Sequence, residues 1–398
     1  EDGIRALVRS RGLGDVYKRQ AHPHHDDATG ERFSYEVELV PPSGLRVISE
    51  KRGVRKELAF IPQASPGYLH SFGLTRRYVV MLTQPYNFNM AKFLSPDRGP
   101  IITNYEWHPE LPSQIILVDR KRGGVVKTFE TDAFFAFHHI NAYEKGDKVI
   151  VDVCAHKDAG VIDALYLKRI RKDHNVPQAR YRRFEVNPST GKLSKRDLIE
   201  AVIELPQKNY DAVNGRHYRY AYGVGLRSAN SGYIDQLVKA DVKTGESKIW
   251  RERGVYPGEP VFVPRPHPRG EDDGVIMSVV LDGGRRRSAL VVEQRYRLRV
   301  HAVLDRPQRG RVLVDERSRQ LDRPGQHMIL GHGLVRDAGG HRVDHRPAGV
   351  GLGAGHSTGA QLAEAAGLGH GLVDPRADPA RQQCFHATML ARLWIPHQ

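Results

Sequence analysis

Cysteine is nearly absent from this sequence, which holds only Cys154 and Cys384 among its 398 residues. Two cysteines do not build the disulfide-rich framework of a small secreted scaffold. They also exclude a zinc or iron–sulfur site that depends on several thiolate ligands. Any metal in this protein is therefore expected on histidine, aspartate or glutamate side chains.

Long apolar runs are missing too, because no stretch reaches the ~18 consecutive apolar residues that a membrane-spanning helix needs. The chain is 39% hydrophobic and 27% charged, as ordinary globular proteins are. Its length suits one large domain or two modest ones. We expect a soluble, cytoplasmic protein whose membrane contact, where it has any, is peripheral.

Lysine and large aromatic residues disappear toward the C-terminus. No lysine follows Lys248, and residues 291–398 contain one tyrosine and one phenylalanine. So few large apolar side chains bury little surface to offset the entropy of the chain. We interpret residues 293–398 as a frame-shifted or disordered tail. Residues 1–20 lack the apolar region of a signal peptide and are interpreted as a non-native leader, which leaves 21–292 as the folded part.

The formal net charge of +15 is typical of proteins that bind phosphates or anionic membranes. Part of this charge belongs to the biased tail, since residues 291–398 carry 15 arginines against 10 acidic residues, a surplus of +5. The charge is therefore weak support for a nucleic-acid partner, and we expect none.

Short strands separated by turns dominate residues 21–292. Runs of β-branched and aliphatic residues, each bounded by turn residues, occupy 77–85, 113–120, 147–155 and 273–282. The best short helix candidate is 161–172.

Three similar hairpins turn near residues 122, 190 and 245, which are 68 and 55 residues apart. Each contains a glycine that supplies the positive φ such turns require. Regularly spaced units of this kind predict an all-β fold, a β-propeller of four-stranded blades, and make a β-sandwich less favoured.

Histidines occur at three strand edges, in AHPHHD at 21–26, YLHSFGLT at 68–75 and FHHINAYE at 137–144. Their first histidines are 48 and 68 residues apart, about one blade each time. One strand of every propeller blade runs along the central axis, so ligands one blade apart in sequence can meet there. A single buried histidine is more often hydrogen-bonded than metal-bound, but three in the same register favour a metal site.

These motifs resemble the carotenoid cleavage oxygenase family, together with YAYGVGL at 220–226, YPGEPVFVPRP at 256–266 and EDDGVIMSVVLD at 271–282. This family includes β-carotene oxygenases, apocarotenoid oxygenases and the retinoid isomerohydrolase of the retinal pigment epithelium. The resemblance implies a seven-bladed β-propeller, incomplete in this chain, with Fe(II) held on its axis by four histidines.

By motif, His22, His70 and His138 match three of the family's iron ligands. Glu204 and Glu259 match carboxylates that accept Nδ1–H hydrogen bonds from ligand rings and so orient them. Their neighbours His24 and His139 are expected to form hydrogen bonds or to pack rather than to bind metal.

Two parts of the family pattern are not found. The fourth histidine belongs to a Phe-His-Gly motif beyond Glu259, and we do not assign His386 to this role because it lies in the biased tail. A third glutamate should precede His22, where this sequence has only the leader. We therefore expect that the opening blades are missing and that the chain as written is inactive.

The function that the resemblance implies is that of a non-haem Fe(II) dioxygenase. Its partners are O2 and a carotenoid or apocarotenoid, whose carbon–carbon double bond is cleaved to give two carbonyl products. Phe72, Phe137 and Tyr143 are candidates for a hydrophobic substrate tunnel, although core packing explains them equally well. Two alternatives stay open: a member that acts on a retinyl ester as an isomerohydrolase, and an inactive propeller that binds anionic partners as a scaffold.

Overall fold

The computed structural model describes residues 22–97, 99–173, 175–294, 297–304 and 312–313. The predicted leader and most of the predicted tail lie outside these residues, so both remain predictions. The chain divides into two compact units, the first formed by residues 1–256 and 262–274 and the second by 257–261 and 275–398.

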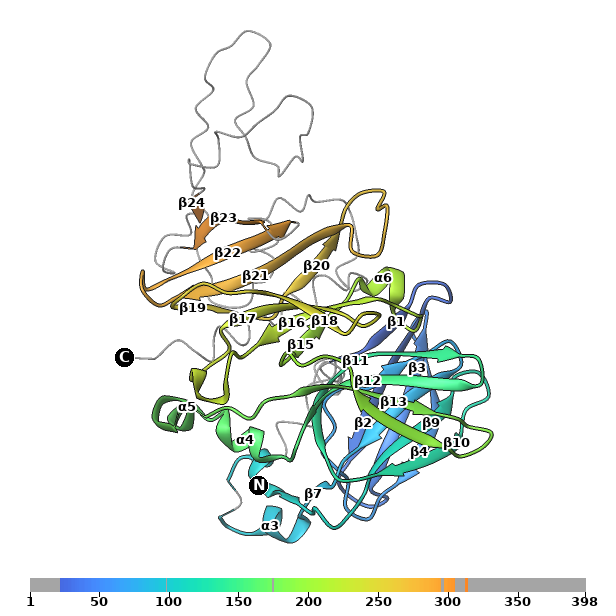
Figure 1. Ribbon diagram of the computed structural model, residues 1–398. Coiled ribbons are helices and arrows are strands. Elements are labelled where there is room, and N and C mark those ends of the chain that lie inside the picture. The colour runs from blue at the N-terminus through green and yellow to red at the C-terminus, as the bar shows by residue number, and fades with distance from the viewer. Residues whose placement is uncertain (1–21, 98, 174, 295–296, 305–311, 314–398) are drawn as a thin grey trace, which may run out of the picture. The chain divides into compact units, whose positions relative to one another are not determined.

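The first unit contains four successive antiparallel sheets of four strands each, which we name blades A to D in chain order (Figure 1). Blade A consists of β1 (His24–Asp26), β2 (Glu31–Glu38), β3 (Gly44–Lys51) and β4 (Val54–Pro62). Blade B consists of β5 (Gly73–Leu74), β6 (Tyr78–Thr83), β9 (Ser113–Asp119) and β10 (Val125–Thr131). Blade C consists of β11 (Phe135–Lys145), β12 (Lys148–His156), β13 (Arg180–Val186) and β14 (Leu193–Asp197). Blade D consists of β15 (Glu204–Gln207), β16 (Tyr220–Gly225), β17 (Gln236–Asp241) and β18 (Glu246–Trp250).

Short elements interrupt three of the blades. Between β6 and β9 the chain forms α3 (Met90–Leu94), η1 (Ile101–Asn104) and a two-stranded sheet of β7 (Tyr86–Phe88) and β8 (Tyr105–Trp107). Blade D carries α6 (Tyr210–Val213) and η2 (Ala229–Ser231). The helix predicted over 161–172 forms as two short helices, α4 (Gly160–Ala164) and α5 (Leu167–Asp173). Among the described residues, no helix has both the length and the apolar composition to cross a membrane.

The predicted hairpins are confirmed, and they are the outer hairpins of successive blades. They join β9 to β10, β13 to β14 and β17 to β18, the third and fourth strands of blades B, C and D. Gly191 and Gly245 take positive φ angles of 74° and 79° in the second and third of these turns. The spacing seen in the sequence is therefore the repeat of the blade itself.

Apolar packing between blades explains why the predicted strand runs are continuously hydrophobic. Every residue of β6 is buried. Val79 and Met81 pack in a cluster shared with blade A, whereas Val80 and Leu82 pack in a cluster shared with blade C. Successive side chains of a strand point to opposite faces, so a blade that is covered on both sides needs an apolar residue at every position.

The strand β12 repeats this arrangement one blade later. Val151 and Val153 pack in the cluster shared with blade B, and Ile150 and Cys154 pack in the cluster shared with blade D. Blades A to D are thus joined in sequence by three apolar clusters, one between each neighbouring pair.

In the second unit, β21 (Gly274–Asp282), β22 (Arg287–Gln294), β23 (Arg297–Leu304) and β24 (Val312–Leu313) pair as antiparallel neighbours in this order. The chain passes between the units at β19 (Val255–Pro257) and β20 (Val261–Pro264). The strand predicted over 273–282 is therefore confirmed as β21. Both β23 and β24 fall inside the range predicted as the tail, most of which lies outside the described residues.

Removing a side chain from the cluster between blades B and C should destabilise the first unit. Leu117 is fully buried there. We expect Leu117→Ala to lower the free energy of unfolding by about 2–5 kcal/mol, because it loses apolar burial and leaves a cavity. Urea denaturation measures the change. Val125→Ala, at a position that is 45% exposed on the neighbouring strand, should change it by less than ~0.5 kcal/mol. Equal effects of the two substitutions would contradict this packing.

Candidate metal centre

Three histidines from the first strands of blades A, B and C come together. His22 lies just before β1, His70 lies just before β5, and His138 lies within β11. One ring nitrogen from each histidine lies within 4.8 Å of the other two. The structure thus brings together the three residues that the sequence predicted as metal ligands.

The spacing of these rings suits a metal ion. Nε2 of His22 and Nε2 of His70 are 3.1 Å apart. Two ligands in neighbouring positions around an ion are separated by about 3 Å when each metal–nitrogen bond is about 2.1 Å. The ring of His138 lies 5.2 Å from that of His22 and 4.9 Å from that of His70, measured between centroids. Neutral imidazoles are a donor set that suits Fe(II) and its neighbours in the first transition row, so these residues fit the predicted ion.

Glu204, one of the two predicted carboxylates, lies behind His138. Nδ1–H of His138 donates to Oε2 of Glu204 over 2.7 Å, and the two side chains are only 10% and 16% exposed. This hydrogen bond fixes the orientation of the ring and its tautomer. The nitrogen of His138 that faces the other two rings is therefore Nε2.

The carboxylate of Glu204 accepts two further hydrogen bonds. Nε2–H of His156 donates to Oε1 over 2.9 Å, and the backbone N–H of Leu205 donates to Oε2 over 2.8 Å. Leu205 has a φ of 47°, a backbone conformation that L residues rarely adopt. Burial by itself raises the pKa of Glu204, but the contacts with His138 and His156 outweigh it and hold that pKa well below its usual range. The group behind His138 is therefore a fixed carboxylate.

Tyr68 occupies the equivalent place behind His70. Its hydroxyl lies 3.1 Å from Nδ1 of His70. Burial raises the pKa of Tyr68, so the hydroxyl keeps its proton at neutral pH. With Nε2 of His70 directed to the metal position, Nδ1–H donates to the Tyr68 oxygen. The sequence analysis did not single out Tyr68 or His156.

The neighbouring histidines His24 and His139, which were predicted to form hydrogen bonds or to pack, have other partners. His24 pairs with the hydroxyl of Tyr210 through Nδ1 over 2.9 Å and with the carbonyl oxygen of Phe72 through Nε2 over 2.7 Å. Nδ1 of His139 lies 3.0 Å from Oγ of Ser71. Burial lowers the pKa of both imidazoles to about 3, with nearby positive groups as lesser causes, so both are neutral at pH 7.

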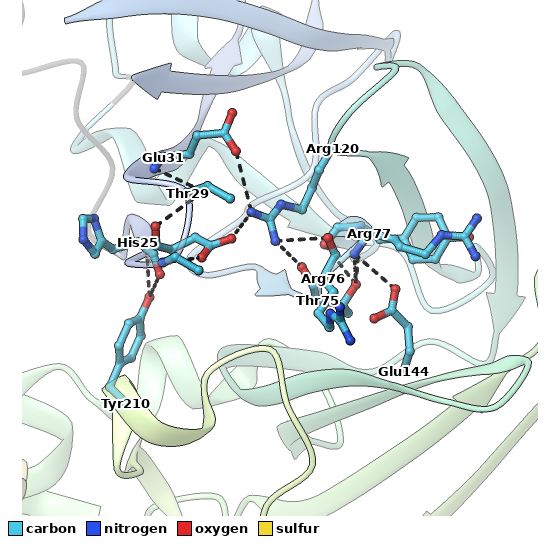
Figure 2. Close-up of polar contacts among 12 residues, drawn as sticks. His25, Thr29, Glu31, Thr75, Arg76, Arg77, Arg120, Glu144 and Tyr210 are labelled. Atoms are coloured by element: carbon cyan, nitrogen blue, oxygen red, sulfur yellow. Dashed lines mark hydrogen bonds and ion pairs between the residues drawn. The ribbon is translucent and has the colours of Figure 1, made fainter. Parts of the chain in front are cut away.

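Arg120 holds the start of blade A against blade B (Figure 2). Its guanidinium donates to Asp26 in β1, lies 3.8 Å from Glu31, and also donates to the carbonyl oxygens of Thr75 over 2.7 Å and Arg76 over 3.3 Å. Figure 2 shows the Arg120 side chain between Glu31 and the Thr75–Arg76 turn. This contact fixes β1, and with it the segment that places His22 beside His70.

Five aromatic rings form a cluster next to two of the histidines. This aromatic cluster consists of Tyr68, Tyr86, Tyr105, Phe135 and Phe137. Phe137 meets the ring of His70 edge-on, with 5.6 Å between centroids. By contrast, Phe72 packs in the cluster between blades A and B, and Tyr143 packs in the cluster between blades C and D. Of the three aromatic residues that the sequence suggested for a tunnel, only Phe137 belongs to the aromatic cluster.

A family model described as retinal pigment epithelial membrane protein (RPE65) matches residues 6–311, more than half of the chain. The chain belongs to this family. It is the carotenoid oxygenase family that the sequence motifs resemble, and its members are iron-dependent enzymes.

Relatives of this carotenoid oxygenase family member have carotenoid-processing names. The chain is 37% identical over 248 residues to a carotenoid isomerooxygenase of Galleria mellonella, covering 58% of this chain and 48% of that protein. It is 31% identical over 328 residues to the mitochondrial carotenoid-cleaving dioxygenase of Homo sapiens, covering 68% of this chain and 56% of that protein. The chain thus spans about half the length of the curated relatives it matches.

Solved structures of the family share the fold. Cobalt-substituted Synechocystis ACO matches with a TM-score of 0.61 and 26% identity, over 69% of this chain and 58% of that one. An ACO/RPE65 chimera matches with a TM-score of 0.61 and 25% identity over the same shares of both chains. The fold is therefore the predicted β-propeller of the carotenoid oxygenase type, and it is incomplete in the described residues.

The remaining predicted site residues lie in the second unit or outside the described residues. Glu259 is buried between β19 and β20 in the second unit, and its role stays a prediction. The position predicted for a third glutamate, before His22, lies outside the described residues, and so does His386. Within the described part of the chain, the metal-ligand group consists of His22, His70 and His138.

Replacing Glu204 by glutamine should weaken metal binding in this carotenoid oxygenase homologue. The amide removes the negative charge and one acceptor, so the ring of His138 is less firmly oriented and less basic. We expect Glu204→Gln to reduce the affinity for Fe(II) or Co(II) about 10–100-fold. A titration with the free metal measures this. Glu185→Gln, which breaks a surface pair with Lys148, is the matched control and should leave the affinity unchanged. Unaltered affinity in Glu204→Gln would remove Glu204 from the centre.

Lys208 is a buried lysine near these histidines. Because burial lowers its pKa, we expect the stability of the chain to depend on pH. Its Nζ donates to the carbonyl oxygen of Ile140 over 2.9 Å and lies 5.1 Å from the centre of the Tyr210 ring. Burial lowers the pKa of Lys208 from 10.5 to about 7. Above about pH 7 the unfolded chain therefore binds a proton at this position that the folded chain does not.

We expect the free energy of unfolding to rise between pH 7 and pH 9 because of this difference in bound protons. Lys208→Met carries no titratable group, so it should flatten the rise. Chemical denaturation of the metal-free chain at both pH values, with and without the substitution, measures the effect. Identical pH dependence in the two proteins would show that Lys208 is protonated in the folded chain.

Proposed function

We propose that this chain is a non-haem Fe(II) dioxygenase that cleaves a carbon–carbon double bond of a carotenoid or apocarotenoid into two carbonyl products. The observation that carries the proposal is the convergence of His22, His70 and His138 at the ends of three successive blades. The names of the relatives support the same reaction class. The partners are O2 and the polyene, and peripheral contact with a membrane that supplies the polyene is part of the proposal.

Each group at the centre has a defined task in this reaction. The three histidines hold Fe(II), which, when bound, supplies the O2 chemistry that inserts both oxygen atoms into the double bond. Glu204 and Tyr68 hold the rings of His138 and His70 from behind. The aromatic cluster offers an apolar surface for a conjugated polyene and excludes water from it. Phe137 is the member of this cluster that contacts both His70 and His138.

We further infer that the chain as written turns over slowly or not at all. The resemblance predicts four histidine ligands, and the described residues bring together three. Fewer neutral ligands bind the ion more weakly and leave its position less defined. Metal binding is therefore the first test of the proposal, and cleavage is the second.

Substituting one histidine at a time should distinguish the metal ligands from the neighbouring histidines that do not bind metal. We expect the unchanged chain to retain about one Fe(II) per molecule and His138→Ala to retain almost none, because two neutral imidazoles form a site too weak to survive desalting. The metal content after anaerobic loading and desalting gives this number. His139→Asn keeps a hydrogen-bonding group toward Ser71 and should retain iron as the unchanged chain does. The reverse order of the two variants would show that the wrong member of the pair was chosen.

The reaction class is tested with a chimera that takes the strands beyond Asp282 from the Synechocystis relative and so supplies the fourth histidine that the resemblance predicts. Incubated with Fe(II), 18O2 and a carotenoid or apocarotenoid, it should release two carbonyl products that each carry one labelled oxygen atom. Release of retinol from a retinyl ester without O2 would favour the isomerohydrolase alternative. Absence of metal binding in both the chain and the chimera would favour the binding scaffold.

A further inference from the structure

His156 ends β12 in blade C and reaches the carboxylate of Glu204 in blade D. Side chains alternate along a strand, so His156 shares the face of β12 that carries Cys154, which packs in the cluster between these two blades. The histidine is 3% exposed. His156 thus contacts Oε1 of Glu204, whereas His138 contacts Oε2. His156 and Glu204 are 48 positions apart in the sequence.

The hydrogen bond determines which nitrogen of His156 carries a proton. In its ionised form, the Glu204 carboxylate can accept hydrogen bonds but cannot donate them, so Nε2 of His156 must be the donor. Nδ1 of His156 is buried without a hydrogen-bond partner, although His156 lies close to the aromatic rings of Phe135 and Phe137. Among the residues that the structure describes, the only polar contact of this imidazole is thus the one with Glu204.

We propose that His156 is a positioning residue of the metal centre: its Nε2–H holds Oε1 of Glu204, so that Oε2 stays on Nδ1–H of His138. A carboxylate can rotate about its last carbon–carbon bond. The Leu205 N–H and His138 both donate to Oε2, so without His156 the buried Oε1 has no donor. Leaving it unpaired costs free energy, which rotation of the carboxylate would relieve at the expense of the bond to His138.

This inference rests on the proposed metal centre, and it extends the chain of contacts by one residue beyond the family motifs. Hydrogen bonds connect His138 in blade C to Glu204 in blade D, and Glu204 to His156 in blade C. The outer histidine acts on the metal only through the carboxylate. Its removal should therefore change the metal site and leave the apolar packing between the blades in place.

Two nearly isosteric substitutions separate hydrogen bonding from packing. His156→Gln keeps an N–H donor at the same reach, whereas His156→Met fills a similar volume without one. Co(II) alone is the probe, because its visible absorption bands report both the affinity and the ligand geometry. We expect His156→Met to weaken Co(II) binding about 10–100-fold and to alter the bands, and His156→Gln to restore both within about threefold of the unchanged chain.

A double-mutant cycle tests whether the effect passes through Glu204. In a Glu204→Ala background, His156→Met should weaken Co(II) binding no further, because the carboxylate that His156 holds is gone. Additive losses would overturn the proposal. His108→Met, at an exposed histidine that pairs with Glu110, is the control and should change nothing.

The remaining outcomes are also decisive. Equal weakening in His156→Gln and His156→Met would overturn the positioning role, because the donor would then not matter. A His156→Met protein that does not fold, while His156→Gln does, would assign His156 to the core of blade C instead. If the unchanged chain does not bind Co(II), the proposed metal centre is wrong. If the unchanged chain and the His156 variants all bind Co(II) equally well, the metal centre stands and the positioning role of His156 is wrong.

Discussion

Face-to-face packing of neighbouring blades is the constraint on which the first unit depends. Each inner strand presents side chains to both sides, and both sides are covered, so β6 and β12 are buried along almost their whole length. Three clusters join blades A to D in order. Because the blades are held in this way, their first strands begin near one another. The four groups of the centre, His22, His70, His138 and Glu204, lie at or next to those strands.

Burial then sets the polar contacts of the centre. An imidazole that is removed from water needs partners for its nitrogen atoms, and each partner fixes a tautomer and a ring orientation. His24 is held by Tyr210 and a backbone carbonyl, so it has no nitrogen left for a metal. Nδ1 of His138 is held by a carboxylate, and its other nitrogen lies toward His22 and His70. His139 is also held on Nδ1, by Ser71, so the feature that distinguishes His138 is that its other nitrogen lies toward two further histidines.

Much of this arrangement could be predicted from the sequence. Turn glycines and β-branched runs located the strands and the outer hairpins, since both signals act over a few residues. The spacing of the histidine motifs indicated the three histidines that the structure brings together, and the family motif indicated Glu204. The roles of His156 and Tyr68 could not be predicted, because no local sequence pattern indicates them. His156, for example, contacts a partner that is 48 positions away, in the next blade. Likewise, an aromatic residue in a core and one beside a metal site look alike in sequence, as Phe72 and Phe137 show.

The charge balance of the centre explains why a divalent cation suits it. One ring nitrogen from each of the three histidines lies within 4.8 Å of the other two. Nε2 of His22 and Nε2 of His70 are 3.1 Å apart, a distance that needs either a shared proton or a cation between them. Glu204 is the carboxylate in contact with this group, and the His138 ring stands between it and the metal position. A divalent ion would be balanced by that negative charge through the ring, which raises the basicity of the ligand nitrogen. The strength of this coupling depends on how firmly the carboxylate is held, and the Leu205 N–H and Nε2–H of His156 donate to its two oxygens.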